Sequence, residues 1–140
     1  MLAVSCNSKY SGDRFFVDFI SVSGGVYEKL EDGTSIPIQG IKVRMEAFAS
    51  DDTGRLSPVI SETCISSSEG TYQFSVQSEE NLFNYFFVFS VTDDSTLRDE
   101  HFSSEERYLY LSPGSSTCFN PVMNSYVVTG NDFLLSLSEN

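Results

Sequence analysis

The chain has 140 residues, enough for one domain of ordinary size with a single hydrophobic core. Hydrophobic residues make up 40% and aromatic residues 14% of the sequence, a composition too apolar for an intrinsically disordered chain. Eight basic and 20 acidic side chains give a net charge of -12, which repels polyanions, so nucleic-acid binding is not expected.

Near the start of the chain, a short apolar stretch ends in Ser5 and Cys6, and a polar run follows. This pattern resembles the end of a bacterial lipoprotein signal peptide, which is cut just before a cysteine that then carries the lipid. Residues 1–14 are therefore interpreted as a lipoprotein-type segment and polar tether, with Cys6 as the lipidation site. An ordinary thiol in a terminal tail is the alternative. The sequence contains no run of roughly 18 apolar residues, so the lipid would be the membrane attachment.

Residues 15–140 predict one all-β domain, because apolar residues recur with a period of two and no amphipathic helix pattern competes. Seven strands in a domain of this size predict a mainly antiparallel Greek-key sandwich. The expected strands are residues 15–22, 41–48, 59–65, 71–76, 85–91, 108–111 and 126–137.

Three of these strands define the expected core. Residues 41–48 and 71–76 alternate between apolar and polar side chains, as half-buried strands do. Residues 85–91 are apolar on both faces, which predicts a central strand covered on both sides. Gly24 and Gly25 predict a bend or bulge after the first strand. The predicted core residues are Val43, Met45, Tyr72, Phe74, Val76, Phe87 and Phe89.

The segments VSGGVYE, DGTSIPIQGIKVRM, SSSEGTYQFSV and FVFSVTDD carry a family resemblance. They resemble the carboxypeptidase regulatory-like, or transthyretin-like (prealbumin-like), β-sandwich from about Val22 to Asp94. Together with Cys6, the chain is similar to short predicted lipoproteins of Gram-negative gut bacteria, some of them encoded beside a radical-SAM enzyme. The resemblance implies a folded spacer or binding module without a catalytic centre.

The inventory of reactive residues agrees with that expectation. The only histidine, His101, lies in an acidic stretch, where a solvated loop residue is the ordinary interpretation. No Gly-x-Ser-x-Gly motif surrounds a serine, and no carboxylate spacing marks a glycosidase pair. We therefore expect no enzyme activity and no catalytic residues.

The longest stretch without a clear strand runs from Asp93 to Glu106. Its acidic side chains favour a basic partner, which makes it the predicted interaction loop; a solvated loop that aids solubility is the alternative. Calcium is a further candidate ligand, but the spacing matches no calcium-binding loop, so neither metal nor cofactor is expected. The residues concerned are Asp93, Asp94, Asp99 and Glu100.

Two further cysteines, Cys64 and Cys118, could form a disulfide in an exported protein. The alternative is that both are small buried apolar residues. Neither lies in the close cysteine pairs of a structural zinc site, so zinc is not expected.

These observations favour a lipid-anchored, non-catalytic module of the cell envelope, at the outer membrane and either periplasmic or surface-exposed, that binds a protein or peptide or has a structural role. A carbohydrate-binding module is the first alternative, and a pilus-like subunit the second. With no tryptophan, sugar binding would depend on tyrosines, and two or more coplanar exposed tyrosines on one face would favour it. The tyrosines concerned are Tyr85, Tyr108, Tyr110 and Tyr126.

Overall fold

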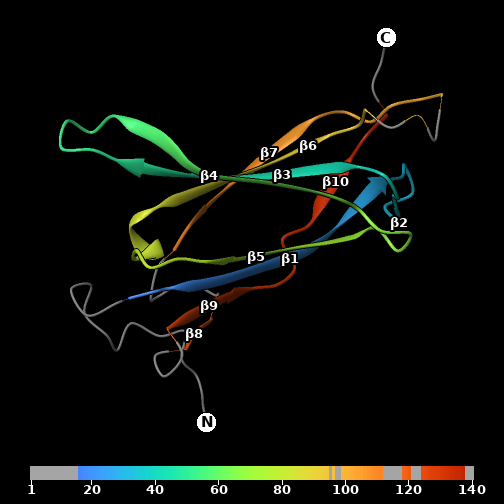
Figure 1. Cartoon of the computed structure of the whole chain (residues 1–140). Helices are drawn as coiled ribbons and strands as arrows, with labels where there is room; N and C mark the ends of the chain where they lie inside the picture. The colour runs from blue at the N-terminus through green and yellow to red at the C-terminus, as the bar shows by residue number, and fades with distance from the viewer. Residues whose placement is uncertain (1–15, 95, 97–98, 112–117, 121–123, 138–140) are drawn as a thin grey trace.

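The computed structural model describes residues 16–94, 96, 99–111, 118–120 and 124–137, and of residues 118–120 it describes the backbone alone. These residues form two β-sheets that lie face to face, as Figure 1 shows. The elements in chain order are β1 (Phe19–Lys29), β2 (Ser35–Pro37), β3 (Lys42–Ser50), β4 (Leu56–Ile65), β5 (Thr71–Gln77), the 3₁₀ helix η2 (Leu82–Asn84), β6 (Phe86–Thr92), β7 (Glu105–Tyr110), β8 (Cys118–Asn120), β9 (Ser125–Val128) and β10 (Phe133–Leu135).

Strand β1 is the centre of the first sheet, because both of its edges are paired. On one edge it pairs antiparallel with β5 and then with β2. On the other edge it pairs parallel with β9 and then with β10. Strand β8 adds to this sheet beside β9. Strands β9 and β10, the last two in the described part of the chain, therefore pair with the first strand.

The second sheet has the strand order β4-β3-β6-β7, and its ladders are antiparallel. Strand β3 begins after a turn in which Gly40 has a φ of 86°, a left-handed value that glycine adopts without strain. The buried Ser66 hydroxyl fixes this turn, since it donates to the Ile38 carbonyl (2.7 Å) and accepts from the Ile41 amide (2.9 Å). The proline and glycine before β3 therefore deliver the chain into the sheet at a defined position.

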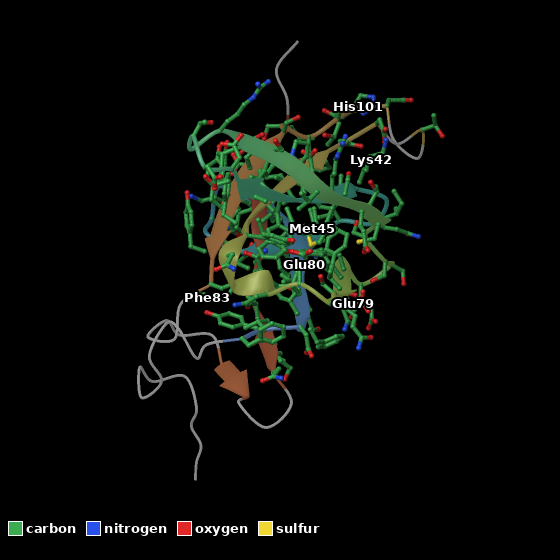
Figure 2. The ribbon with its side chains drawn as sticks, turned by 60° about the vertical axis from the view of Figure 1, so that its left-hand side comes forward. Lys42, Met45, Glu79, Glu80, Phe83 and His101 are labelled. Atoms are coloured by element: carbon green, nitrogen blue, oxygen red, sulfur yellow. The ribbon has the colours of Figure 1, made fainter. Side chains whose placement is uncertain are left out.

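The core lies between the two sheets and consists of side chains that alternate along the strands. Every second residue of β5 is buried, and Figure 2 shows Met45 of β3 between the two layers. The predicted all-β sandwich is confirmed, and so is its predicted core, because all seven residues are at most 5% exposed: Val43, Met45, Tyr72, Phe74, Val76, Phe87 and Phe89.

Three details of the predicted strands are wrong. Strand β1 passes through Gly24 and Gly25 without a break, since its pairing with β5 keeps one register from Phe19 to Gly25. The stretch 126–137 is not one strand but two, because the chain leaves the sheet between β9 and β10 with Gly130 at a φ of 69°. The described residues also form ten strands where seven were expected, since segments of three residues are too short to show a period.

A fourth correction concerns β6, which was expected to be covered on both faces. Phe87, Phe89 and Val91 point into the core and are fully buried. Phe86 and Val88 point to the other side and are only half-buried. The apolar outer face of β6 is therefore a surface feature and not part of the core.

Candidate functional site

The outer face of the second sheet, turned away from the core, carries three aromatic rings side by side. Phe48 of β3 lies opposite Phe86 of β6, and Phe86 lies opposite Tyr110 of β7. The ring centroids of Phe48 and Phe86 are 5.3 Å apart at an interplanar angle of 18°, and those of Phe86 and Tyr110 are 5.5 Å apart at 23°. We call these three residues the aromatic row. Because the rings stack, they turn their faces toward one another and their edges toward solvent.

The aromatic row continues into an exposed apolar surface. Tyr110 is 66% exposed, and Tyr108, two residues earlier on the same face of β7, is 57% exposed. Leu56 of β4, at the other side of the sheet, is 49% exposed. Contiguous exposed apolar side chains of this kind mark interaction sites on folded proteins.

A cleft of about 200 Å³ lies beside the aromatic row, and we call it the aromatic cleft. The 3₁₀ helix η2 contributes to its wall and is held by Asn81, whose side-chain oxygen accepts from the Phe83 amide (3.1 Å) and the Val17 amide (2.9 Å). The lining is mostly hydrocarbon: Phe48, Ser50, Leu56, Phe83, Asn84, Tyr85, Phe86, Tyr110 and Leu111.

Carboxylates lie around this apolar surface. The Tyr108 hydroxyl donates to Glu106 Oε1 at 3.2 Å, and this bond raises the pKa of Tyr108. Burial and the Glu80 carboxylate raise the pKa of Tyr85. Both phenols therefore stay neutral around pH 7, and the negative charge near the row comes from the two glutamates. A ligand with basic groups beside an apolar group would complement this surface.

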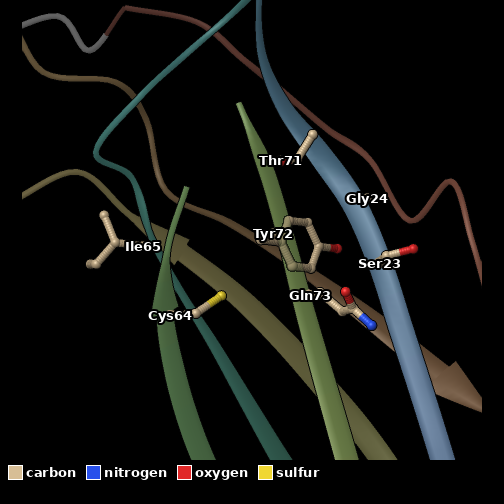
Figure 3. Close-up of a pocket in the computed structure, with 7 residues that line it drawn as sticks. All are labelled: Ser23, Gly24, Cys64, Ile65, Thr71, Tyr72 and Gln73. Atoms are coloured by element: carbon tan, nitrogen blue, oxygen red, sulfur yellow. The ribbon is translucent and has the colours of Figure 1, made fainter. Parts of the chain in front are cut away.

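A second cleft, of about 410 Å³, opens between β4 and β5 (Figure 3). The Cys64 thiol points from β4 toward β5, whereas Ile65 points away. Burial raises the pKa of Cys64 and that of Tyr72, whose hydroxyl donates to the Asn131 carbonyl. A thiol with a raised pKa is mostly protonated around pH 7 and is then a weak nucleophile. The lining residues are Ser23, Gly24, Cys64, Ile65, Thr71, Tyr72 and Gln73.

The predicted interaction loop divides into anchored and exposed parts. The Asp93 side chain is fully buried; its Oδ2 accepts from the Phe102 amide at 2.9 Å, and its Oδ1 lies 3.6 Å from His101 Nδ1. His101 itself is 44% exposed on its side chain and, with Lys42, lies on the outer side of the second sheet in Figure 2. Asp93 therefore shapes the loop and is not available to a partner.

The other three predicted interaction residues of this loop are exposed. Asp94 Oδ2 forms an ion pair with Lys42 Nζ at 2.7 Å, which lowers the pKa of Asp94. Asp99 and Glu100 are exposed. The end of the predicted loop is not irregular, because Glu105 and Glu106 belong to β7. Of the four predicted interaction residues, three therefore remain accessible to a partner, one of them through an exposed ion pair.

Replacing Asp93 with alanine is expected to lower the free energy of unfolding by about 2 kcal/mol, because the buried Phe102 amide loses its charged acceptor. Replacing Asp99 with asparagine is the matched control and should leave stability within about 0.5 kcal/mol. Urea unfolding followed by circular dichroism measures both. Equal stability of the two variants would show that Asp93 does not anchor the loop.

Several predicted site residues lie outside the described residues, wholly or in part. Cys6 falls in the undescribed N-terminal segment, so its lipidation stays a prediction. Cys64 is a free cysteine in the structure, so the structure does not show the predicted bridge to Cys118, whose side chain is not described. Within the described ranges, no group of three or more His, Cys, Asp or Glu side chains is placed to hold a metal ion. No helix in these ranges is long and apolar enough to cross a bilayer.

The tyrosines considered for sugar binding have different environments. Tyr126 is fully buried, Tyr85 is partly buried at the aromatic cleft, and Tyr108 and Tyr110 are exposed on one face. Sequence reasoning missed Phe48 and Phe86. The signal for Phe86 was present, because a strand that is apolar on both faces is either doubly covered or displays an apolar face.

Comparisons with known proteins do not identify a family. No protein-family model and no curated protein matches the chain. Among solved structures, the major plantain pollen allergen Pla l 1 is similar, with a TM-score of 0.47 and 14% identity over 87% of this chain and 96% of that chain. The dioxygenase domain of a dioxygenase carbohydrate-binding protein fusion from the cellulolytic bacterium Streptomyces sp. SirexAA-E has a TM-score of 0.47 and 14% identity, over 96% of this chain and 87% of that chain. Similarity at this level says nothing about function.

Proposed function

We propose that this chain is a non-catalytic binding module that recognises a segment of a protein partner on the outer face of its second sheet. The observation that carries the proposal is the aromatic row with a hydrocarbon-lined cleft beside it. An exposed apolar cleft of about 200 Å³ can accept one large apolar side chain, which is the usual anchor of a protein interface.

Ring geometry favours a protein segment over a sugar. A sugar platform presents ring faces, but in the aromatic row Phe48 and Phe86 cover each other's faces at an interplanar angle of 18°. The cleft lining also offers few polar groups to the hydroxyls of a sugar, and a hydroxyl buried without a partner costs free energy. An apolar side chain needs neither an exposed ring face nor polar partners in the cleft.

The sequence motifs give independent support for a binding role. Their resemblance to transthyretin-like sandwiches implies a spacer or binding module. The proposal places the module at the cell envelope, attached through a lipid on Cys6, on the basis of the Ser5-Cys6 pattern and the polar tether. The lipid would hold the domain near envelope partners without taking part in recognition.

A glycan ligand is the second candidate, because Tyr108 and Tyr110 are both more than half exposed on one face of β7. The outward face of Tyr110, on the edge strand, is the position where a sugar ring could stack.

Panning a random-peptide phage library and a glycan array against the intact chain tests both candidates. We expect peptide ligands whose affinity falls at least about tenfold in Tyr110→Ser, since central aromatic residues dominate interfaces. Val127→Ser, which removes a side chain 43% exposed on the first sheet, is the control and should bind normally. Glycan binding that is seen with the unchanged chain and lost in Tyr110→Ser would favour the second candidate. Ligands that bind both variants equally would remove the outer face from the function.

A further inference from the structure

The free edge of β7 is the second feature of the outer face that points to a ligand. Strand β7 is the last strand of its sheet, and among the described residues only β6 pairs with it. Most of its residues are exposed. An edge of this kind presents unpaired backbone N–H and C=O groups, which can bind an additional strand.

The opposite edge of the same sheet is protected. Strand β4 contains Pro58, which has no N–H to donate, and its pairing with β3 shifts register between Ala47 and Phe48. Proline and bulges are the devices by which proteins block strand addition. Strand β7 runs from Glu105 to Tyr110 and contains neither. Among the described residues, the edge of β7 is therefore the less protected of the two, although β7 carries the charged Arg107, whose guanidinium carbon lies 5.4 Å from the Phe133 ring centroid.

The aromatic row ends at this open edge. Its rings are spaced by 5.3 and 5.5 Å, close to the distance of about 4.8 Å between neighbouring strands, because each strand contributes one ring. One face of the Tyr110 ring stacks on Phe86, and Tyr110 as a whole is 66% exposed. A strand added beside β7 would bring its own side chain opposite Tyr110 to the other face of this ring, where an aromatic ring would continue the stack.

The Glu106 carboxylate sets the expected side chain at a second position of the ligand. Glu106 lies on the same face of β7 as Tyr110, four residues earlier, because side chains alternate along a strand. The segment just before β7 is already paired with another part of the chain. Its Ser103 amide donates to the Ser136 carbonyl at 2.8 Å, and Phe102 forms an isolated antiparallel β-bridge with Leu137. Among the described residues, no second strand pairs with β7 from Glu105 to Tyr110, so we take this range as the edge available to a ligand.

We infer that β7 binds an extended peptide segment of a partner protein as an added strand, with an aromatic side chain opposite Tyr110 and a lysine or arginine opposite Glu106. The two ligand residues are four positions apart, so both face the same side of the added strand. The backbone ladder provides affinity and the two side chains provide selectivity. This inference rests on the proposed function and assigns the register and chemistry of its ligand.

Synthetic peptides test the register directly. A threonine-rich peptide of seven residues carries phenylalanine at its second and lysine at its sixth position. Its matched control carries the lysine at the fifth position, on the opposite face. We expect the first peptide to bind the intact chain at least about tenfold more tightly by fluorescence anisotropy, with protection of β7 amides from hydrogen exchange. N-methylation of alternate peptide residues on the paired edge should abolish binding.

Variants of the chain assign the two contacts. Tyr110→Ser should remove the preference for phenylalanine, and Glu106→Gln should remove the preference for lysine together with its decrease at high salt. Val127→Ser should bind as the unchanged chain does. Equal affinity for the two peptides, or amide protection on a strand other than β7, would overturn the inference. If library peptides still need Tyr110 in that case, the proposed function stands and only the strand addition fails.

Discussion

Replacing Phe74 with alanine is expected to lower the free energy of unfolding by about 3 to 5 kcal/mol. Phe74 is 3% exposed in the centre of β5, and its ring contacts rings from both sheets. Its centroid lies 5.8 Å from that of Tyr72 and 6.0 Å from that of Phe89. Removing the ring therefore loses its transfer from water and leaves a cavity between the sheets that neighbouring strands cannot close.

Gln73→Ala provides the matched control, because Gln73 is the exposed neighbour of Phe74 on the same strand. Its side chain makes one hydrogen bond of 3.3 Å at the surface, to the Ser21 hydroxyl, so the change should stay within about 0.5 kcal/mol. Chemical denaturation with urea measures both variants. A loss below about 1 kcal/mol for Phe74→Ala would mean that the two sheets do not pack through this ring.

Strand alternation was sufficient to predict the fold class and the central core. In β5, Tyr72, Phe74 and Val76 are buried and the residues between them are exposed, as a period of two requires. Alternation reports which residues share a face, but it does not report what covers that face. The interpretation of residues 85–91 as doubly covered failed for this reason, and it hid the aromatic row.

Long-range pairing was the second limit of the sequence. Nothing local indicates that β9 and β10 pair parallel with β1, since their partners lie more than a hundred positions earlier in the chain. The role of Asp93 was hidden in the same way, because its buried contact with the Phe102 amide depends on how the loop folds back. The candidate site itself needs the register of three strands, which brings Phe48, Phe86 and Tyr110 together.

The second large effect is expected from Gly24→Ala, with a loss of about 3 kcal/mol in the free energy of unfolding. A Cβ atom at this position would overlap the backbone carbonyl group of Asn131, with the carbonyl carbon only 2.5 Å away. The chain between β9 and β10 is held against β1 here, because the Asn131 amide donates to the Ser23 carbonyl at 3.0 Å and the Gly25 amide donates to Asp132 Oδ1 at 2.8 Å. Neither backbone can move away without losing these bonds, so glycine is required at position 24 for close approach.

Gly33→Ala distinguishes this contact from the general cost of replacing a glycine. Gly33 has a φ of 90° in an exposed turn, and a Cβ atom there would meet no atom within 4 Å. The variant should therefore lose only about 1 kcal/mol, from the left-handed backbone alone. Urea unfolding compares the two variants, and hydrogen exchange at the β10 amides locates the damage, which should appear in Gly24→Ala and be absent in Gly33→Ala. Equal losses with unchanged exchange at β10 would show that the connection between β9 and β10 does not pack against Gly24.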